Sequence, residues 1–168
     1  RTGKVASLAF SPDGSSLIFS GNLGALTCVD LATAVRRELH AHDAAVSSVA
    51  FSPDGRIAMS ASSSSSPTLR SDRGRENSLR MWDMERSVAL RVIPLVCGAR
   101  DAAFSPTGHA VAVADESGSI HLFSYRSGQL IRTIELPNSF FFTADVKFSR
   151  DGLSLWLNTQ TRQSMMLK

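Results

Sequence analysis

Short stretches in which apolar residues alternate with small or polar ones are the main pattern of this chain. Four of these stretches end at a phenylalanine that is followed at once by Ser and a turn: Val5 to Phe10, Val46 to Phe51, Ala99 to Phe104 and Thr143 to Phe148. Alternation with a period of two, bounded by Pro, Asp and Gly, is typical of half-buried β-strands. The pattern therefore predicts short strands joined by tight turns.

The turn after each phenylalanine recurs along the sequence. Residues 10–14 and 51–55 both read FSPDG, and residues 104–108 (FSPTG) and 148–152 (FSRDG) are degraded copies. Pro presets the first central residue of such a turn, Asp suits the second, and Gly accepts the left-handed exit. The four phenylalanines lie 41, 53 and 44 residues apart, which predicts a series of similar units. Four strands are expected in each unit and three in the last, about fifteen in all.

The stretch from Ala41 to Asp83 carries the residues of a known family. Ala41-His42 stands where that family usually has Gly-His, and Trp82-Asp83 is the closing dipeptide. The stretch resembles a WD40 repeat, and the resemblance covers nearly the whole chain. It implies an all-β fold: a partial β-propeller of about four blades, each a four-stranded antiparallel sheet, with the last blade incomplete.

The resemblance divides the chain into four WD40-like repeats, with boundaries at 1–42, 43–94, 95–138 and 139–168. The second contains a polar insertion, residues 62–76, which accounts for most of the longest spacing. Its serines and alternating charges cannot bury enough apolar surface to offset the entropy of ordering, so a disordered loop is expected. Because closure protects the sheet edges of a propeller, the chain is interpreted as a fragment, an open arc completed by remaining blades of the same chain. A closed four-bladed ring is the alternative.

Composition, net charge and cysteine usage argue against several classes of protein. The chain of 168 residues is 43% hydrophobic, enough for a sizeable core, and its net charge of +3 is scattered, so no nucleic-acid partner is expected. No apolar run reaches the ~18 residues of a membrane span, and residues Arg1 to Lys4 do not lead into the long apolar stretch expected of a signal peptide. Cys28 and Cys97 belong to no Cys-x-x-Cys pair, so two reduced thiols in an intracellular protein, cytoplasmic or nuclear, are expected.

The resemblance also implies a structural tetrad in the second repeat. The family ties a blade together with a His before the first strand, a Ser or Thr in the second, an Asp in the next turn and a Trp in the third strand. These places are taken by His42, Ser60, Glu76 and Trp82, with Glu76 in the place of the Asp. Buried imidazole, hydroxyl and indole groups all need partners, and a connected chain supplies them. The other repeats lack the set, so packing alone is expected to hold their blades.

A histidine, a serine and an acid also suggest nucleophilic catalysis. Ser60, however, is expected in mid-strand, with no glycine elbow or oxyanion loop beside it, so no catalytic residue is assigned. His40 and His42 form an H-x-H pair with no third ligand nearby, and there is no phosphate-binding loop. No metal and no cofactor are expected.

Two segments are candidates for contact with a partner. Arg70, Arg73 and Arg75 lie in the insertion, where a phosphate added to a nearby serine would pair with them; a tolerated surface loop without a role is the alternative. Phe140 and Phe141 belong to a run of three aromatics that cannot all face inward on a strand. One of them is a candidate binding anchor, and packing against a neighbouring blade is the alternative.

Two acidic residues are further candidates. Asp101 and Asp145 each lie three residues before the phenylalanine that ends an innermost strand, where the first two repeats have Ser7 and Ser48. The carboxylates either form an acidic patch in the channel for a basic ligand, or are paired with a structural partner such as Arg100. Solvent-inaccessible carboxylates bonded to backbone amides would exclude the ligand.

The sequence thus predicts a non-enzymatic protein–protein interaction scaffold, part of a larger WD40 propeller in a multiprotein assembly, with other proteins as partners. One alternative is a reader of a peptide or modified tail through the channel face of the propeller. A propeller enzyme is the other alternative, but it needs convergent carboxylates from several blades, and Asp101, Asp115 and Asp145 are too few.

Overall fold

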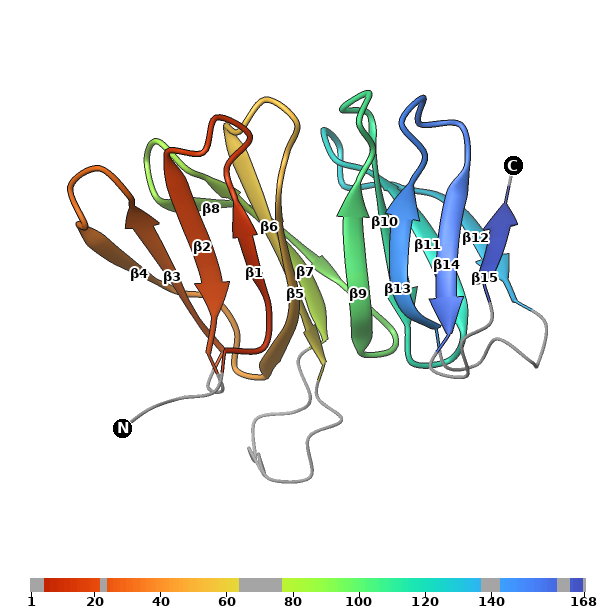
Figure 1. The fold of residues 1–168 in the computed structure, drawn as a ribbon. Helices are drawn as coiled ribbons and strands as arrows, with labels where there is room; N and C mark the ends of the chain where they lie inside the picture. Colours follow the sequence, from red (N-terminus) through yellow and green to blue (C-terminus); the bar gives the residue numbers. More distant parts are fainter. Residues whose placement is uncertain (1–4, 22–23, 64–76, 137–142, 160–163, 168) are drawn as a thin grey trace.

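A computed structural model describes residues 5–21, 24–63, 77–136, 143–159 and 164–167. These residues form fifteen strands in four antiparallel sheets and contain no helix, and the sheets stand side by side in an arc (Figure 1). The arc is not closed. The predicted fold, a partial propeller of about four blades with the last one incomplete, is confirmed.

Each sheet is a simple meander in which consecutive strands are hydrogen-bonded, and the sheets are called blades 1 to 4. Blade 1 consists of β1 (Leu8–Phe10), β2 (Ser16–Ser20), β3 (Ala25–Asp30) and β4 (Arg36–His40). Blade 2 consists of β5 (Ala45–Phe51), β6 (Ile57–Ser63), β7 (Ser78–Asp83) and β8 (Val88–Pro94). Blade 3 consists of β9 (Ala99–Phe104), β10 (Ala110–Asp115), β11 (Ser119–Ser124) and β12 (Leu130–Glu135). Blade 4 consists of β13 (Thr143–Phe148), β14 (Leu155–Thr159) and β15 (Ser164–Leu167).

The core is divided among the contacts between neighbouring blades. The innermost strands β1, β5, β9 and β13 follow one another along the arc (Figure 1), and one cluster of buried side chains fills each space between two blades. Large members of these clusters are Ile18, Leu26 and Trp82 between blades 1 and 2, Met59, Leu79 and Phe123 between blades 2 and 3, and Ile120, Leu155 and Leu157 between blades 3 and 4. Each blade is therefore stabilised mainly by its neighbours.

The FSPDG turns are held by their own side chains. The hydroxyl of Ser11 donates to Asp13 Oδ1 at 2.6 Å, and Ser52 donates to Asp54 Oδ1 at 2.6 Å. Gly14 follows Asp13 with a φ of 71°, which an L-residue adopts only with strain. The hydrogen bond from Ser11 is the largest cause that lowers the pKa of Asp13 to about 2.

The end of β6 corrects one predicted boundary. The predicted insertion, residues 62–76, begins two residues too early, because Ser62 and Ser63 pair with Val46 and Ala45 as part of β6. Ser62 is also fully buried, and its hydroxyl accepts the amide of Ser78 at 3.0 Å. A run of serines looks like a loop, but this serine completes a sheet. Residues 64–76 lie outside the described part of the chain, and the repeat boundaries stay predictions.

Acid should weaken the FSPDG turns. The folded pKa of Asp13 lies below its ordinary value of 3.8, so the carboxylate contributes stability above about pH 4, and this contribution is lost as the pH falls toward 2. Asp13→Asn should lower the free energy of unfolding at pH 7, and the difference from the wild-type chain should shrink between pH 4 and 2. Urea unfolding at pH 7, 4 and 2.5 measures this, and a difference that is independent of pH would contradict the assignment.

Two glycines with the same backbone conformation should respond differently to alanine. Gly24 and Gly14 have φ values of 75° and 71°, but a Cβ on Gly24 would lie 1.8 Å from the backbone oxygen of His42, whereas a Cβ on Gly14 meets nothing within 4 Å. Gly14→Ala should cost ~1–2 kcal/mol of stability through strain alone. Gly24→Ala should cost roughly 3 kcal/mol or more, because overpacking adds to the strain. Equal losses in urea unfolding would show that Gly24 does not pack against blade 2.

Candidate functional site

A chain of hydrogen bonds runs through buried side chains of blade 2. Nε2 of His42 lies 2.7 Å from the hydroxyl of Ser60, and the indole N–H of Trp82 donates to the same hydroxyl at 2.9 Å. The three residues are 7%, 0% and 4% exposed. One oxygen thus satisfies two ring nitrogens in an interior that would otherwise leave them without partners.

Three different elements bring these residues together. Ser60 lies in the middle of β6, and Trp82 lies near the end of the neighbouring β7. His42 precedes β5, and its backbone N–H donates to the carbonyl of Gly24 in blade 1 at 3.0 Å. The position of the imidazole therefore depends on the contact between two blades.

The other ring nitrogen of His42 has a partner that the sequence analysis missed. Nδ1 lies 3.0 Å from the hydroxyl of Ser78, the first residue of β7. Glu76, the predicted acidic member of the tetrad, lies outside the described residues. Alternation along β7 could have revealed Ser78, because residues 78, 80 and 82 share one face of the strand.

Blade 3 contains a different polar network, which the sequence analysis also missed. Asp115, at the end of β10, accepts from Nε2 of His121 at 2.9 Å and from the hydroxyl of Ser117 and the backbone amide of Ser119 at 2.7 and 2.9 Å. Burial alone would raise the pKa of Asp115, but these hydrogen bonds outweigh it and the pKa is lowered. The carboxylate fastens the turn between β10 and β11, so polar contacts as well as packing support this blade.

One hydrogen bond recurs between the innermost strands of neighbouring blades. In each innermost strand we call the residue three positions before the final phenylalanine the acceptor position. The residue that directly follows the acceptor position is the donor position. A side-chain oxygen at the acceptor position binds the backbone N–H at the donor position of the next blade. The three pairs are Ser7 with Val49 at 3.1 Å, Ser48 with Ala102 at 3.2 Å and Asp101 with Val146 at 2.9 Å.

The two candidate aspartates differ in their surroundings. Asp101 is partly buried and uses both oxygens, because Oδ1 accepts the hydroxyl of Ser48 at 2.7 Å and Oδ2 accepts the amide of Val146. Asp145 is exposed. The structure thus gives Asp101 a place between three blades and leaves Asp145 accessible at the end of the series.

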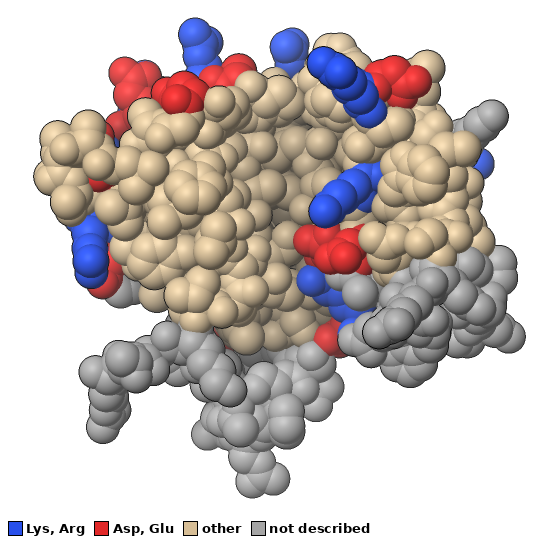
Figure 2. Space-filling view, viewed as in Figure 1, with Lys and Arg blue, Asp and Glu red and all other residues tan. Residues whose placement is uncertain are grey.

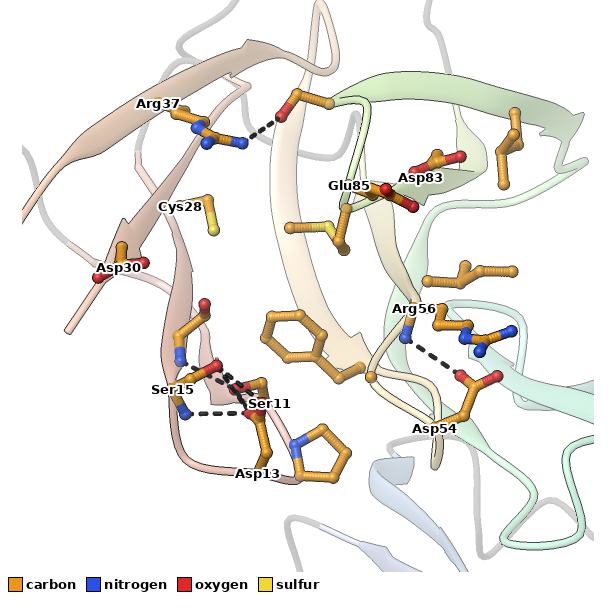
Figure 3. A pocket seen from close by; sticks show the side chains of 18 of the residues that line it. Ser11, Asp13, Ser15, Cys28, Asp30, Arg37, Asp54, Arg56, Asp83 and Glu85 are labelled. Carbon is orange, nitrogen blue, oxygen red and sulfur yellow. Dashed lines mark hydrogen bonds between the residues drawn. The ribbon is translucent and has the colours of Figure 1, made fainter. Parts of the chain in front are cut away.

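A groove of about 780 Å³ lies between blades 1 and 2 (Figure 3). Apolar side chains such as Phe51, Met84 and Leu90 line it together with Cys28, whose thiol has a raised pKa because it is partly buried. Five carboxylates and two guanidinium groups also line it, those of Asp13, Asp30, Asp54, Asp83, Glu85, Arg37 and Arg56. Arg37 donates to the hydroxyl of Ser87 at 3.5 Å and so joins the two blades.

Charge is unevenly distributed on the face that shows the innermost strands. Figure 2 shows a broad uncharged area over β1, β2 and β5, with both acidic and basic side chains along the edge that carries the β1–β2 turn. The groove opens near this edge, because residues of that turn line it. The groove therefore opens among charged residues of the turns in blades 1 and 2, Asp13, Asp54 and Glu85 among them.

Residues 33–83 match the family model described as WD domain, G-beta repeat. The chain thus contains a WD40 repeat. The match begins just before β4 of blade 1 and ends with Trp82-Asp83 at the end of β7, so it contains the His42, Ser60 and Trp82 cluster. No curated protein gives a significant match to the sequence.

Several predicted contact residues of the chain are not described by the structure. Arg70, Arg73, Arg75, Phe140 and Phe141 all lie outside the described residues. Within the described ranges, no group of three or more His, Cys, Asp or Glu side chains could hold a metal ion. The same ranges include no helix with the length and apolar character that crossing a membrane requires.

Removing the imidazole of His42, which lies in the matched WD40 repeat, should destabilise the protein. His42→Ala removes the imidazole that hydrogen-bonds the buried hydroxyls of Ser60 and Ser78, so the free energy of unfolding should fall by ~1–3 kcal/mol. Ser60→Ala should have a similar effect, and the double variant should lose less than the sum, because the residues share one network. Urea unfolding measures all three variants.

The matched control is His109→Ala, which removes an exposed imidazole next to a turn. Its effect should stay within about 0.5 kcal/mol. If His42→Ala is no more destabilising than this control, the buried hydrogen bonds do not stabilise blade 2.

Proposed function

We propose that this chain is a non-enzymatic protein–protein interaction scaffold, part of a larger WD40 propeller in a multiprotein assembly. WD40 repeat domains generally act as protein-interaction scaffolds. The observation that carries the proposal for this chain is the groove between blades 1 and 2, which combines an apolar lining with exposed charge at its turns. We therefore assign the partner-binding surface to this groove.

Charge complementarity defines the partner segment. Five carboxylates against two guanidinium groups give the groove an excess of negative charge. Asp13 and Asp54 keep their charge to low pH, because hydrogen bonds from Ser11 and Ser52 are the largest causes that lower their pKa values. A protein segment that presents Lys or Arg beside an apolar side chain fits these surroundings.

Burial argues against catalysis at the histidine–serine pair. The Ser60 hydroxyl is inaccessible to solvent and already binds His42 and Trp82. A nucleophile must reach the substrate, and this oxygen lies inside the blade. The pair therefore has a structural role in the proposed scaffold.

The face formed by the innermost strands, which would line the channel of the propeller, is a weaker candidate for binding a peptide or modified tail. A tail reader at that face would use Asp101 and Asp145, but Asp101 already binds Ser48 and the amide of Val146. One accessible carboxylate is too little for an acidic pocket. The groove, with its apolar lining and several charged groups, is the better partner site.

Two further parts of the proposal concern context. The remaining blades of the propeller are proposed to come from the same polypeptide, because the open arc leaves apolar faces at both ends, at Leu8 and Phe10 in blade 1 and at Trp156 in blade 4. An intracellular setting, cytoplasmic or nuclear, is proposed because Cys28 and Cys97 are free.

Affinity purification with matched variants tests the groove. Glu85→Lys with Leu90→Lys reverses a charge and removes an apolar contact in the groove without touching the turn hydrogen bonds. Proteins that co-purify with the wild-type chain through the groove should be depleted at least about tenfold, since ~1.4 kcal/mol of lost binding energy changes an affinity tenfold. Quantitative mass spectrometry measures the ratio.

The control variant carries Glu135→Lys and Ile131→Lys in β12. Both residues are exposed, neither lines the groove, and the substitutions match those in β8 and the preceding turn. The control should retain the partners. Partners that are lost equally from both variants, or retained by both, would refute the groove as the binding surface.

A further inference from the structure

Asp145 occupies the acceptor position of blade 4, the last in the series. At the three earlier acceptor positions, Ser7, Ser48 and Asp101 each hold a backbone N–H of the next blade. The side chain of Asp145 is exposed, and no hydrogen bond or ion pair to it is found within the described residues. The regular register of the series identifies the group that this carboxylate is placed to receive.

The surrounding face of blade 4 is also uncovered. In β14 and β15, Trp156 and Met166 lie side by side and are 49% and 43% exposed. The equivalent pair of side chains in β10 and β11 of blade 3 is Ala112 and Leu122; Ala112 is fully buried and Leu122 partly buried in the cluster shared with blade 4. A large aromatic side chain beside an open acceptor indicates a surface that receives another sheet.

Blade 1 shows what such a sheet presents. Its donor position is Leu8, and Leu8 and Phe10 are 56% and 58% exposed on the side of blade 1 that faces away from blade 2. In blade 2 the same two places are Val49 and Phe51, which pack against blade 1 while the amide of Val49 binds Ser7. A WD40 blade thus offers a backbone N–H and, two residues later, a phenylalanine.

We propose that the Asp145 carboxylate receives the backbone N–H at the donor position of a fifth blade from the same polypeptide, which covers Trp156. This inference rests on the proposed function, because it names the partner of one end of the larger propeller. A carboxylate accepts an amide more strongly than the serine hydroxyls at Ser7 and Ser48, since the bond is charge-assisted. Asp101 already makes this bond to Val146 at 2.9 Å.

A tandem protein tests the proposal with a defined probe. Two full copies of the chain are joined by a flexible linker, so that blade 1 of the second copy can serve as the fifth blade of the first. Asp145→Ala in the first copy should lower the unfolding midpoint by roughly 2–4 °C, the shift expected for one hydrogen bond in a protein of this size. The same substitution in the second copy, where no blade follows, should leave the midpoint unchanged. Asp145→Asn in the first copy keeps an acceptor oxygen and should retain most of the stability.

A second measurement separates the acceptor from the packing of the blade. With Trp156→Phe in the second copy, acrylamide quenching reports the exposure of Trp156 in the first copy against the constant buried Trp82. Trp156 should be shielded in the tandem protein and accessible in the single chain. If Trp156 is shielded but Asp145→Ala has the same small effect in both copies, the acceptor role is wrong and the larger propeller stands.

Two other outcomes would overturn the proposal differently. If Trp156 stays equally accessible in the tandem protein, no blade packs on blade 4. This result would contradict both the role of Asp145 and the proposal of a larger propeller. If the single chain associates as its concentration rises, and Asp145→Ala abolishes this association in sedimentation experiments, the occupant is a second copy of the chain.

Discussion

Packing of each blade against the next is the constraint on which this structure depends. A small antiparallel sheet has two faces and cannot cover either of them alone. In β5, Val49 and Phe51 face blade 1 while Ala50 between them faces blade 3. The same order returns in β9, where Ala102 and Phe104 face blade 2 and Ala103 faces blade 4. In both strands the final phenylalanine lies on one face and an alanine on the other, so the blades interdigitate in one direction along the arc.

The polar contacts follow from this packing. When innermost strands lie beside each other, their outward amides lose water and need acceptors. Side chains at the acceptor positions supply them, as Ser48 does for Ala102 and Asp101 does for Val146. The buried polar groups of blade 2 are satisfied in the same way, because the backbone that carries His42 is fixed by Gly24 of blade 1. Hydrogen bonds in this fold therefore fix the register of surfaces that hydrophobic contacts bring together.

Much of this architecture could be predicted because it is local in the sequence. The FSPDG turns and the period-two strands are visible within short windows, and the recurrence of these windows along the sequence gives the number of units. His42, Ser60 and Trp82 could be chosen because each has a definite place relative to a strand or turn, and the structure brings the three together.

The remaining features depend on contacts between distant segments. The second acceptor bond of Asp101 involves a residue 45 positions away, and the groove between blades 1 and 2 combines turns from two repeats. The buried role of Ser78 could not be predicted because Ser78 adjoins a polar insertion. The role of Ser62 could not be predicted because a run of five serines resembles a loop. In both cases burial, which the sequence does not display, decides the role of a small polar residue.

The residues of the WD40 match divide into a buried set that packs between two blades and an exposed set on the turns. Residues 33–83 begin at the outermost strand of blade 1 and end in the third strand of blade 2, so one sequence unit crosses the space between two blades. Its buried residues, Trp82 and His42 among them, fill the interior with apolar packing and hydrogen bonds. Its turn residues, such as Asp54, remain exposed along the same space and line the groove. The turn residues are therefore free of the packing constraint that the neighbouring blade places on the strands beneath them.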